Sequence, residues 1–178
     1  MDYPAWKYYP LNSRPPEWVG EVVNVVNRAE LQISTVAAHT GLSSDEVLAQ
    51  LRPGLEALGF DVERGKRADQ KVRRSVLFGE NGKARVSYEV DAFHDHLGIA
   101  MEVEAGRGAQ SNGDYRNIVR TSLILDARFM VLLQALAYRS NPHAAAIAGY
   151  ANTRDQLDAI YASRRLVLPF EGVLLVGY

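Results

Sequence analysis

The stretch "YEVDAFHDHLGIAMEVEAGRG", residues 88–108, decides the fold, because it is typical of two β-strands joined by a short turn. Both strands alternate apolar and polar side chains, as a sheet with one covered face requires. The polar positions hold acids: Glu89 and Asp91 share a face of the first strand, and Glu102 and Glu104 share a face of the second. We therefore expect an antiparallel pair with its acids on one side.

The register of this pair determines how close the acids come. With Phe93 opposite Gly98, Asp91 faces Ala100, and Glu102 lies diagonally from it at a backbone separation of roughly 7 Å. Carboxylates this close raise one another's pKa unless a cation or a set of donors compensates. Mg²⁺ suits such a patch, since it binds one or two carboxylates and keeps positions for water and a phosphate oxygen. The alternative is a solvent-facing side of the sheet, where acids serve solubility.

The segments around this pair predict an α/β fold with a mixed sheet. Strands are indicated by alternation or short apolar runs at residues 60–63, 74–79, 84–93 and 98–106. Asn81-Gly82 predicts a tight hairpin turn. A helix follows with Tyr115, Ile118, Val119 and Leu123 inward, then the buried strand "RFMVLLQAL", a helix near residues 153–162 and a final strand "GVLLVGY".

The N-terminal part predicts helices that pack on this sheet. Residues 17–29 place Trp18, Val22, Val25 and Val26 on one helical stripe. A second helix begins at a capping box formed by Ser43 and Glu46, and Pro53 should bend or divide it. We expect a single domain over residues 1–178, in which residues 1–42 form an N-terminal extension and a helix that packs on the rest.

A second interpretation of residues 34–58 is a helix-turn-helix of a winged-helix-like regulator, because "TGLS" resembles the turn of that motif. Its recognition helix would present Asp45 and Glu46 to the phosphates of DNA, where affinity comes largely from Lys and Arg. This charge favours ordinary helix packing over DNA reading.

Composition narrows the classes of function. The chain has no cysteine, so disulfides, thiolate metal sites and a cysteine nucleophile are excluded. No segment has the apolar length of a signal peptide or a membrane span, and we expect a cytoplasmic protein without an organic cofactor. Residues 64–128 hold twelve Lys and Arg against nine Asp and Glu, and the run "RGKRADQKVRR" could attract a polyanion.

The spacing of the acids resembles a known family. Asp91, ten intervening residues and then Glu102-Val103-Glu104, between a helix ending in "LGF" and a helix with an apolar strand, resemble the PD-(D/E)XK nuclease superfamily. The resemblance spans about residues 43–136 and implies a restriction endonuclease-like sheet flanked by helices. It also implies that Asp91 and Glu102 bind Mg²⁺ or Mn²⁺.

The chain departs from the usual motif at Glu104, where the superfamily most often has Lys. An acid there is similar to the BamHI and BglII branch of restriction endonucleases, and it implies that Glu104 binds metal or acts as a base. Glu56 and Glu63 are possible additional acids. Lys66, Arg107 and Arg116 are the candidates for contacts with nucleic acid, whereas we interpret Lys71 and Arg120 as surface charges.

The sequence thus predicts a metal-dependent endonuclease that hydrolyses phosphodiester bonds in DNA, similar to type II restriction enzymes. The resemblance implies that it acts as a homodimer. The alternative is a non-catalytic protein, either an inactive relative that keeps the fold or the winged-helix-like regulator of residues 34–58. A requirement for metal separates the two classes.

Overall fold

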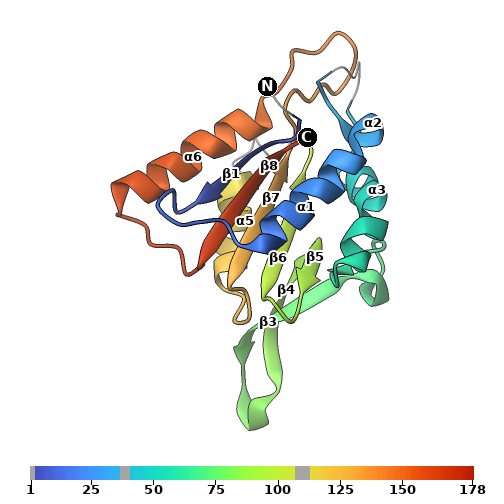
Figure 1. Ribbon diagram of the computed structural model, residues 1–178. Coiled ribbons are helices and arrows are strands. Elements are labelled where there is room, and N and C mark those ends of the chain that lie inside the picture. The colour runs from blue at the N-terminus through green and yellow to red at the C-terminus, as the bar shows by residue number, and fades with distance from the viewer. Residues whose placement is uncertain (1–2, 37–40, 107–112) are drawn as a thin grey trace.

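The computed structural model describes residues 3–36, 41–106 and 113–178, and it contains two β-sheets (Figure 1). The larger sheet has six strands in the order β1-β8-β7-β6-β5-β2. Its strands are β1 (Ala5–Tyr9), β2 (Asp61–Val62), β5 (Ala92–His94), β6 (Ile99–Glu104), β7 (Phe129–Gln134) and β8 (Gly172–Gly177). The smaller sheet is the hairpin of β3 (Val72–Phe78) and β4 (Ala84–Val90), which projects from the body of the molecule.

The six-stranded sheet is parallel at its centre and antiparallel toward both edges. β6, β7 and β8 are parallel, while β1 pairs antiparallel with β8, and β5 pairs antiparallel with both β6 and β2. The helices are α1 (Glu17–Arg28), α2 (Glu30–Ile33), α3 (Ser44–Ala57), α5 (Gly113–Ser122) and α6 (Gly149–Ser163). The predicted class, a mixed sheet flanked by helices, is confirmed.

Each face of the large sheet has its own apolar layer, because neighbouring residues of a strand point to opposite faces. Met101 and Val103 of β6 belong to the layer that α1, α2 and α3 cover. Ala100 belongs to the layer that α5 and α6 cover. The central strands β7 and β8 are buried along their whole length, as a strand covered on both faces must be.

Helix α3 begins as predicted at the capping box. The Ser43 side chain accepts a hydrogen bond from the backbone nitrogen of Glu46, whose carboxylate accepts one from the backbone nitrogen of Ser43. Val47, Leu48, Leu51 and Leu55 are buried on one side, which holds α3 against the sheet. Pro53 lies inside the continuous helix, so it does not divide α3.

The strand β1 was not predicted, because prolines interrupt the N-terminal sequence. It forms an edge of the large sheet, with Ala5 opposite Gly177 and Tyr9 opposite Val173. The Tyr9 ring is fully buried, and its hydroxyl donates to Asp158 Oδ1 of α6 at 2.6 Å. The N-terminal segment therefore adds a strand to the sheet as well as a helix to its surface.

Of the four residues predicted to point inward from helix α5, only Ile118 is buried. Tyr115, Val119 and Leu123, which the apolar pattern places inward, are 42%, 56% and 48% exposed. The side chains that α5 buries are mostly polar: Asp114, Asn117, Ile118 and Thr121. Apolar periodicity selects the wrong side here, because the buried side of α5 binds polar groups of the sheet and of α6.

Asp114 shows why that side is polar. Its two carboxylate oxygens accept hydrogen bonds from Gln134 Nε2 and Thr153 Oγ1, each at 2.6 Å, and all three side chains are fully buried. This network ties α5 to β7 and α6 beside the end of β6. Among the described helices, none combines the length and apolar character needed to cross a membrane.

Candidate active site

Asp91 lies where the chain passes from the projecting hairpin into the large sheet. The strand predicted over residues 84–93 is in fact two strands, because β4 ends at Val90 and β5 begins at Ala92. The Oδ2 atom of Asp91 accepts a hydrogen bond from the backbone nitrogen of Val103 at 2.7 Å. β5 starts one residue too late to pair with this part of β6, so the carboxylate satisfies the backbone donor of Val103.

The observed register brings Asp91 nearer to Glu102 than predicted. Phe93 pairs with Ala100, not with Gly98, and Ala92 pairs with Met101, so extending this register by one residue sets Asp91 opposite Glu102. The prediction is wrong by two residues because Gly98 belongs to the turn, where its φ of +66° is outside the range of a strand. The two acids are thus directly opposed across neighbouring strands and not diagonal.

Asp91 and Glu102 share one face of the sheet. Phe93, two residues after Asp91, and Ala100, two residues before Glu102, lie in the layer covered by α5 and α6. Because side chains alternate along a strand, Asp91 and Glu102 point to that same side. The convergence of these two acids on one face, predicted from alternation alone, agrees with the packing of their neighbours.

Glu104 shares this face but is held by α5. Its Oε1 atom accepts a hydrogen bond from Asn117 Nδ2 at 2.7 Å and lies 3.8 Å from Arg116 Nη2. The backbone oxygen of Glu104 accepts a bond from the Tyr178 hydroxyl at 3.2 Å. These contacts fix the end of β6 and direct the Glu104 carboxylate toward the polar side of α5.

Glu63 extends the line of acids on the other side of Asp91. The pairing of β2 with β5 sets Val62 opposite Ala92, and the backbone nitrogen of Glu63 donates to the backbone oxygen of Asp91 at 2.8 Å. Glu63, Asp91 and Glu102 therefore occupy one register line across three neighbouring chain segments, which we call the acid row. Glu63 was predicted only as a possible additional acid.

Lys71 is a cation that pairs with the acid row. Its interpretation from the sequence as a surface charge is wrong. Its Nζ atom lies 2.7 Å from Glu63 Oε1 and 3.8 Å from Glu89 Oε2. The side chains of Lys71 and Glu63 are only 14% and 7% exposed. The available signal was positional, since Glu63 directly follows β2 and Lys71 directly precedes β3.

The pKa values of the acids reflect burial and mutual repulsion. Burial, together with the charges of Glu63 and Glu104, raises the pKa of Asp91 to about 7, although the hydrogen bond from Val103 acts to lower it. Burial, followed by the charge of Asp91, raises the pKa of Glu102 well above its usual range. Two opposed carboxyls that resist losing both protons are the arrangement that a cation would relieve.

Within residues 3–36, 41–106 and 113–178, no three acidic or histidine side chains lie close enough together to hold a metal ion. Glu104 is bound to Asn117, and Glu63 is bound to Lys71. The chemistry of Asp91 and Glu102 nevertheless fits Mg²⁺, which binds through one or two carboxylates and retains several waters. A site built on this pair alone needs no third protein ligand.

Two of the three predicted nucleic-acid contacts, Lys66 and Arg116, lie near the acids of the candidate site. Lys66 is exposed and its Nζ atom lies 2.6 Å from Asp45 Oδ2, at the start of α3. Arg116 is exposed on α5 beside Glu104. Arg107 lies outside the residues that the structure describes.

Glu56 is not part of the acid row. It lies on α3 and binds Arg64 Nη2 at 2.8 Å, and both side chains are substantially exposed. Of the two additional acids that the resemblance suggests, the structure brings Glu63 to Asp91 and leaves Glu56 on the outer surface.

A cleft of about 460 Å³ opens beside Glu104, at the end of β6 and the start of α3. It is lined by Ser43, Ser44, Asp45, Lys66, Glu104, Ala105 and Tyr138. Ser44 Oγ accepts a hydrogen bond from the backbone nitrogen of Ala105 at 2.9 Å, which ties the wall of the cleft to β6. The cleft opens to Glu104, and Asp91 and Glu102 do not line it.

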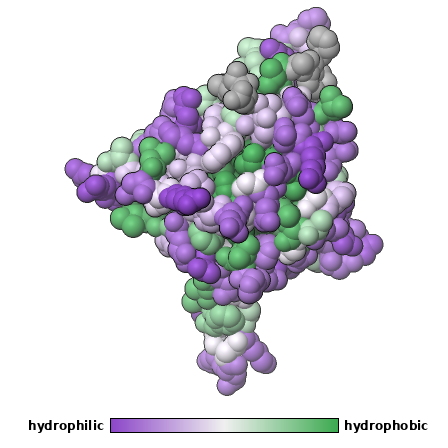
Figure 2. Space-filling model, viewed as in Figure 1, coloured by the Kyte–Doolittle hydropathy of each residue, from purple (hydrophilic) through white to green (hydrophobic). Residues whose placement is uncertain are grey.

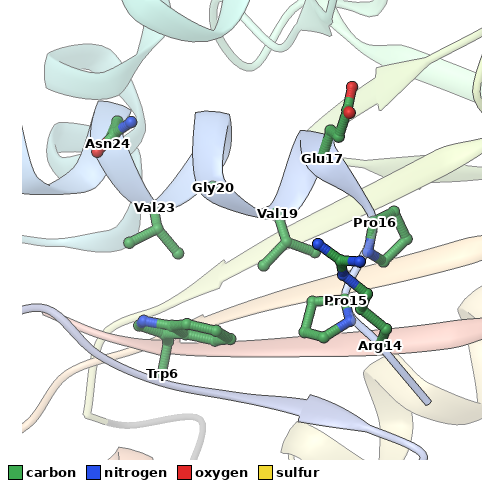
Figure 3. Close-up of a pocket in the computed structure, with 9 residues that line it drawn as sticks. All are labelled: Trp6, Arg14, Pro15, Pro16, Glu17, Val19, Gly20, Val23 and Asn24. Atoms are coloured by element: carbon green, nitrogen blue, oxygen red, sulfur yellow. The ribbon is translucent and has the colours of Figure 1, made fainter.

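A second groove, of about 760 Å³, lies at the other edge of the sheet, between β1 and α1 (Figure 3). The Trp6 ring forms its floor below Val19 and Val23, and Arg14 and Glu17 stand at one end. It contains none of the acids of the acid row. We therefore do not assign the chemistry to this groove.

The comparisons with known proteins bear on the fold. No protein-family model matches the sequence, and no curated protein sequence matches it. Among solved structures, the chain is similar to restriction endonuclease BglII complexed with a DNA 16-mer. The TM-score is 0.52 at 12% sequence identity, and the match covers 99% of this chain and 76% of the other. The chain thus has a restriction endonuclease-like fold.

Proposed function

We propose that this protein is a divalent-metal-dependent nuclease that hydrolyses phosphodiester bonds in DNA. The observation that carries the proposal is the opposition of Asp91 and Glu102, two desolvated carboxyls on one sheet face, in a restriction endonuclease-like fold. A purely structural pair of acids would be costly to bury without a compensating cation.

Asp91 and Glu102 would hold Mg²⁺ or Mn²⁺ between them. When bound, the metal polarises a phosphate oxygen and lowers the pKa of a coordinated water. Asp91 is prepared for this task because the hydrogen bond from Val103 fixes Oδ2 and orients the carboxylate. Glu102 is held in place by β6, which is buried between β5 and β7.

Glu104 would orient the attacking water or accept its proton. Burial raises the pKa of Glu104, while the hydrogen bond from Asn117 lowers it, so its basicity depends on α5. A carboxyl with a raised pKa is a better proton acceptor near neutral pH than an ordinary surface glutamate. Asn117 keeps this oxygen within the acid row's face of the sheet.

Negative charge develops on the phosphate during hydrolysis, and cations stabilise it. The motif position that most often supplies a Lys holds Glu104 in this chain, so other cations are needed. Lys71 is the buried cation nearest to the acid row, through its pair with Glu63. Arg116 is exposed beside Glu104 and can reach toward a bound phosphate. We assign these two side chains to stabilisation of the negative charge in the transition state.

DNA is the substrate class, since BglII, which has a similar fold, was solved in complex with DNA. A duplex has two strands to cut, and a homodimer places one acid row at each of them. We expect this homodimer from the family resemblance. Lys66 and Arg116, at the border of the acid row, remain the candidate phosphate contacts.

The test is cleavage of supercoiled plasmid in the presence of Mg²⁺ or Mn²⁺. The unaltered protein should nick and then linearise the plasmid, and EDTA should prevent this. Asp91→Asn and Glu102→Gln should lose activity by at least two orders of magnitude, because each removes one charged ligand. Glu21→Gln, which changes an exposed acid of α1, is the matched control and should cut normally.

The second candidate function is an inactive relative that binds DNA without cutting it. Glu63 is bound to Lys71 and Glu104 is bound to Asn117. Only two acids are left for a metal, which favours this second candidate. Binding of duplex DNA by the unaltered protein, with no metal-dependent cleavage at any pH between about 6 and 9, would establish that candidate instead.

A further inference from the structure

The projecting hairpin β3–β4 is the feature that the acid row leaves unexplained (Figure 1). Its strands pair only with each other, from Val72 opposite Val90 to Phe78 opposite Ala84. Seven residues per strand give it a length of about 20 Å. A two-stranded hairpin by itself is marginally stable in water, so an extended one points to a contact outside the monomer.

Only the root of the hairpin is attached to the body. The backbone oxygen of Ser75 accepts from the backbone nitrogen of Leu125 at 3.1 Å, and the Arg120 guanidinium lies 5.4 Å from the centre of the Tyr88 ring. Among the described residues, no hydrogen bond joins residues 76–87 to the rest of the protein. The outer half, which we call the arm, begins at Val76, which still packs against the core, and its residues 77–85 are exposed to solvent.

The cations of the hairpin divide in the same way. At the root, Arg73 pairs with Glu89 at 2.8 Å and Arg74 pairs with Asp95 at 2.9 Å. On the arm, Lys83 and Arg85 are exposed, and neither has an acidic partner among the described residues. The positive charge is neutralised internally near the body, whereas near the tip Lys83 and Arg85 outnumber the one acid of the arm, Glu80.

The arm also exposes apolar side chains beside these cations. Leu77 and Phe78 are 48% and 53% exposed, and Figure 2 shows hydrophobic surface on the hairpin above a hydrophilic tip. At the tip, Asn81 and Gly82 both have positive φ, as a tight hairpin turn requires, so the arm ends bluntly. It thus combines a narrow ribbon, unpaired cations and exposed apolar groups.

We propose that the arm, residues 76–87, inserts into the major groove of duplex DNA beside the acid row. The major groove is about 12 Å wide and admits a two-stranded β-ribbon. Lys83 and Arg85 contact phosphates at its rim, while Leu77 and Phe78 contact the apolar edges of bases. The root of the arm continues directly into Asp91 through Val90, so the arm and the acid row engage one duplex.

This inference rests on the proposed function, because DNA is the substrate named there. Binding is therefore measured without cleavage, by fluorescence anisotropy of a labelled 20-base-pair duplex in EDTA. The variants are Lys83→Ala/Arg85→Ala and Leu77→Ser/Phe78→Ser. The matched control is Arg14→Ala/Arg165→Ala, which removes two exposed cations from outside the arm. Circular dichroism on each variant verifies that the fold is retained.

The charge variant should bind at least tenfold more weakly at 0.1 M salt, and the slope of log K against log salt should fall by about 2. The apolar variant should bind more weakly with an unchanged slope, and the control should bind like the unaltered protein. Equal loss in control and arm variants, or no loss in the arm variants, overturns the inference.

Sedimentation velocity tests whether the arm binds a second copy of the protein and not DNA. If the arm variants dissociate a dimer but leave DNA affinity unchanged, the arm binds a second copy and the inference fails. If the arm variants lose DNA binding while the unaltered protein cuts no plasmid, the inference stands and the proposed nuclease activity fails. If the unaltered protein cuts plasmid and the arm variants bind DNA as tightly as it does, the nuclease activity stands and the inference about the arm fails.

Discussion

The Oδ2 atom of Asp91 accepts a hydrogen bond from the backbone nitrogen of Val103, 2.7 Å away and between the two glutamates of β6. This bond links the two segments that carry the acids at the point where β5 no longer pairs with β6. It fixes Asp91 opposite Glu102, so one contact determines both the local backbone pairing and the spacing of the carboxyls.

Replacing Asp91 by Ala should destabilise the protein, because the buried backbone donor of Val103 loses its acceptor. The expected loss is about 1–3 kcal/mol of unfolding free energy. Asp91→Asn keeps an oxygen at this position and should cost less, while abolishing metal-dependent cleavage. Urea denaturation measures the stability of both variants. Equal stability of Asp91→Ala and the unaltered protein would contradict this role of the bond.

The stability of the metal-free protein should fall as pH rises from about 4 toward 7. The pKa of Asp91 is raised to about 7 in the folded protein, and that of Glu102 is also raised, so the folded state binds more protons than the unfolded state in this window. Stability then decreases with increasing pH until both states are deprotonated. Thermal unfolding in EDTA from pH 4 to 8 measures the trend.

Divalent metal should oppose this loss, since it binds the deprotonated pair. Addition of Mg²⁺ or Mn²⁺ should raise the melting temperature at pH 8 and have little effect at pH 5. The variant Asp91→Asn/Glu102→Gln should lose most of the pH dependence and the response to metal. A metal response that survives in this variant would locate the binding elsewhere.

Removing Lys71 should cost stability, because it leaves Glu63 buried without its counter-ion. Lys71→Met should lower the unfolding free energy by about 3 kcal/mol, and Glu63→Gln in the same chain should restore part of the loss. The exposed pair of Arg64 and Glu56 is the control, since Arg64→Met should change stability by less than about 1 kcal/mol. Chemical denaturation of the double-mutant cycle provides the measurement.

Asn117 should matter for the rate of cleavage more than for metal binding. Asn117→Ala frees the Glu104 carboxylate, which should lower kcat about tenfold while the affinity for Mn²⁺ stays the same. Single-turnover cleavage and titration of Mn²⁺ separate the two quantities. A parallel fall of rate and metal affinity would mean that Glu104 is itself a ligand.

Local patterns predicted much of the fold. Strand alternation, the capping box of Ser43 and Glu46, and the Asn81-Gly82 turn are each encoded by neighbouring residues, so they can be derived without the rest of the chain. The mixed sheet was also predicted, and β6 and β7, which a helix separates along the chain, pair in parallel. β1 was missed because its partner β8 lies at the far end of the sequence.

Sequence patterns predicted part of the arrangement of the candidate site, whose assignment stays a prediction. Asp91 and Glu102 follow from alternation, but the partners of the acids are set by tertiary contacts that no spacing reveals. Lys71 is buried by a turn of the chain that brings it back to Glu63. The buried side of α5 is polar where periodicity favours an apolar one, so Asn117 was not recognised as the partner of Glu104.

Anomalous diffraction from a crystal of the unaltered protein soaked in Mn²⁺ would locate the metal itself. One strong peak is expected between the carboxylates of Asp91 and Glu102, at about 2.1 Å from an oxygen of each. A crystal with no peak there, or with Mn²⁺ bound only at other residues, would contradict this expectation.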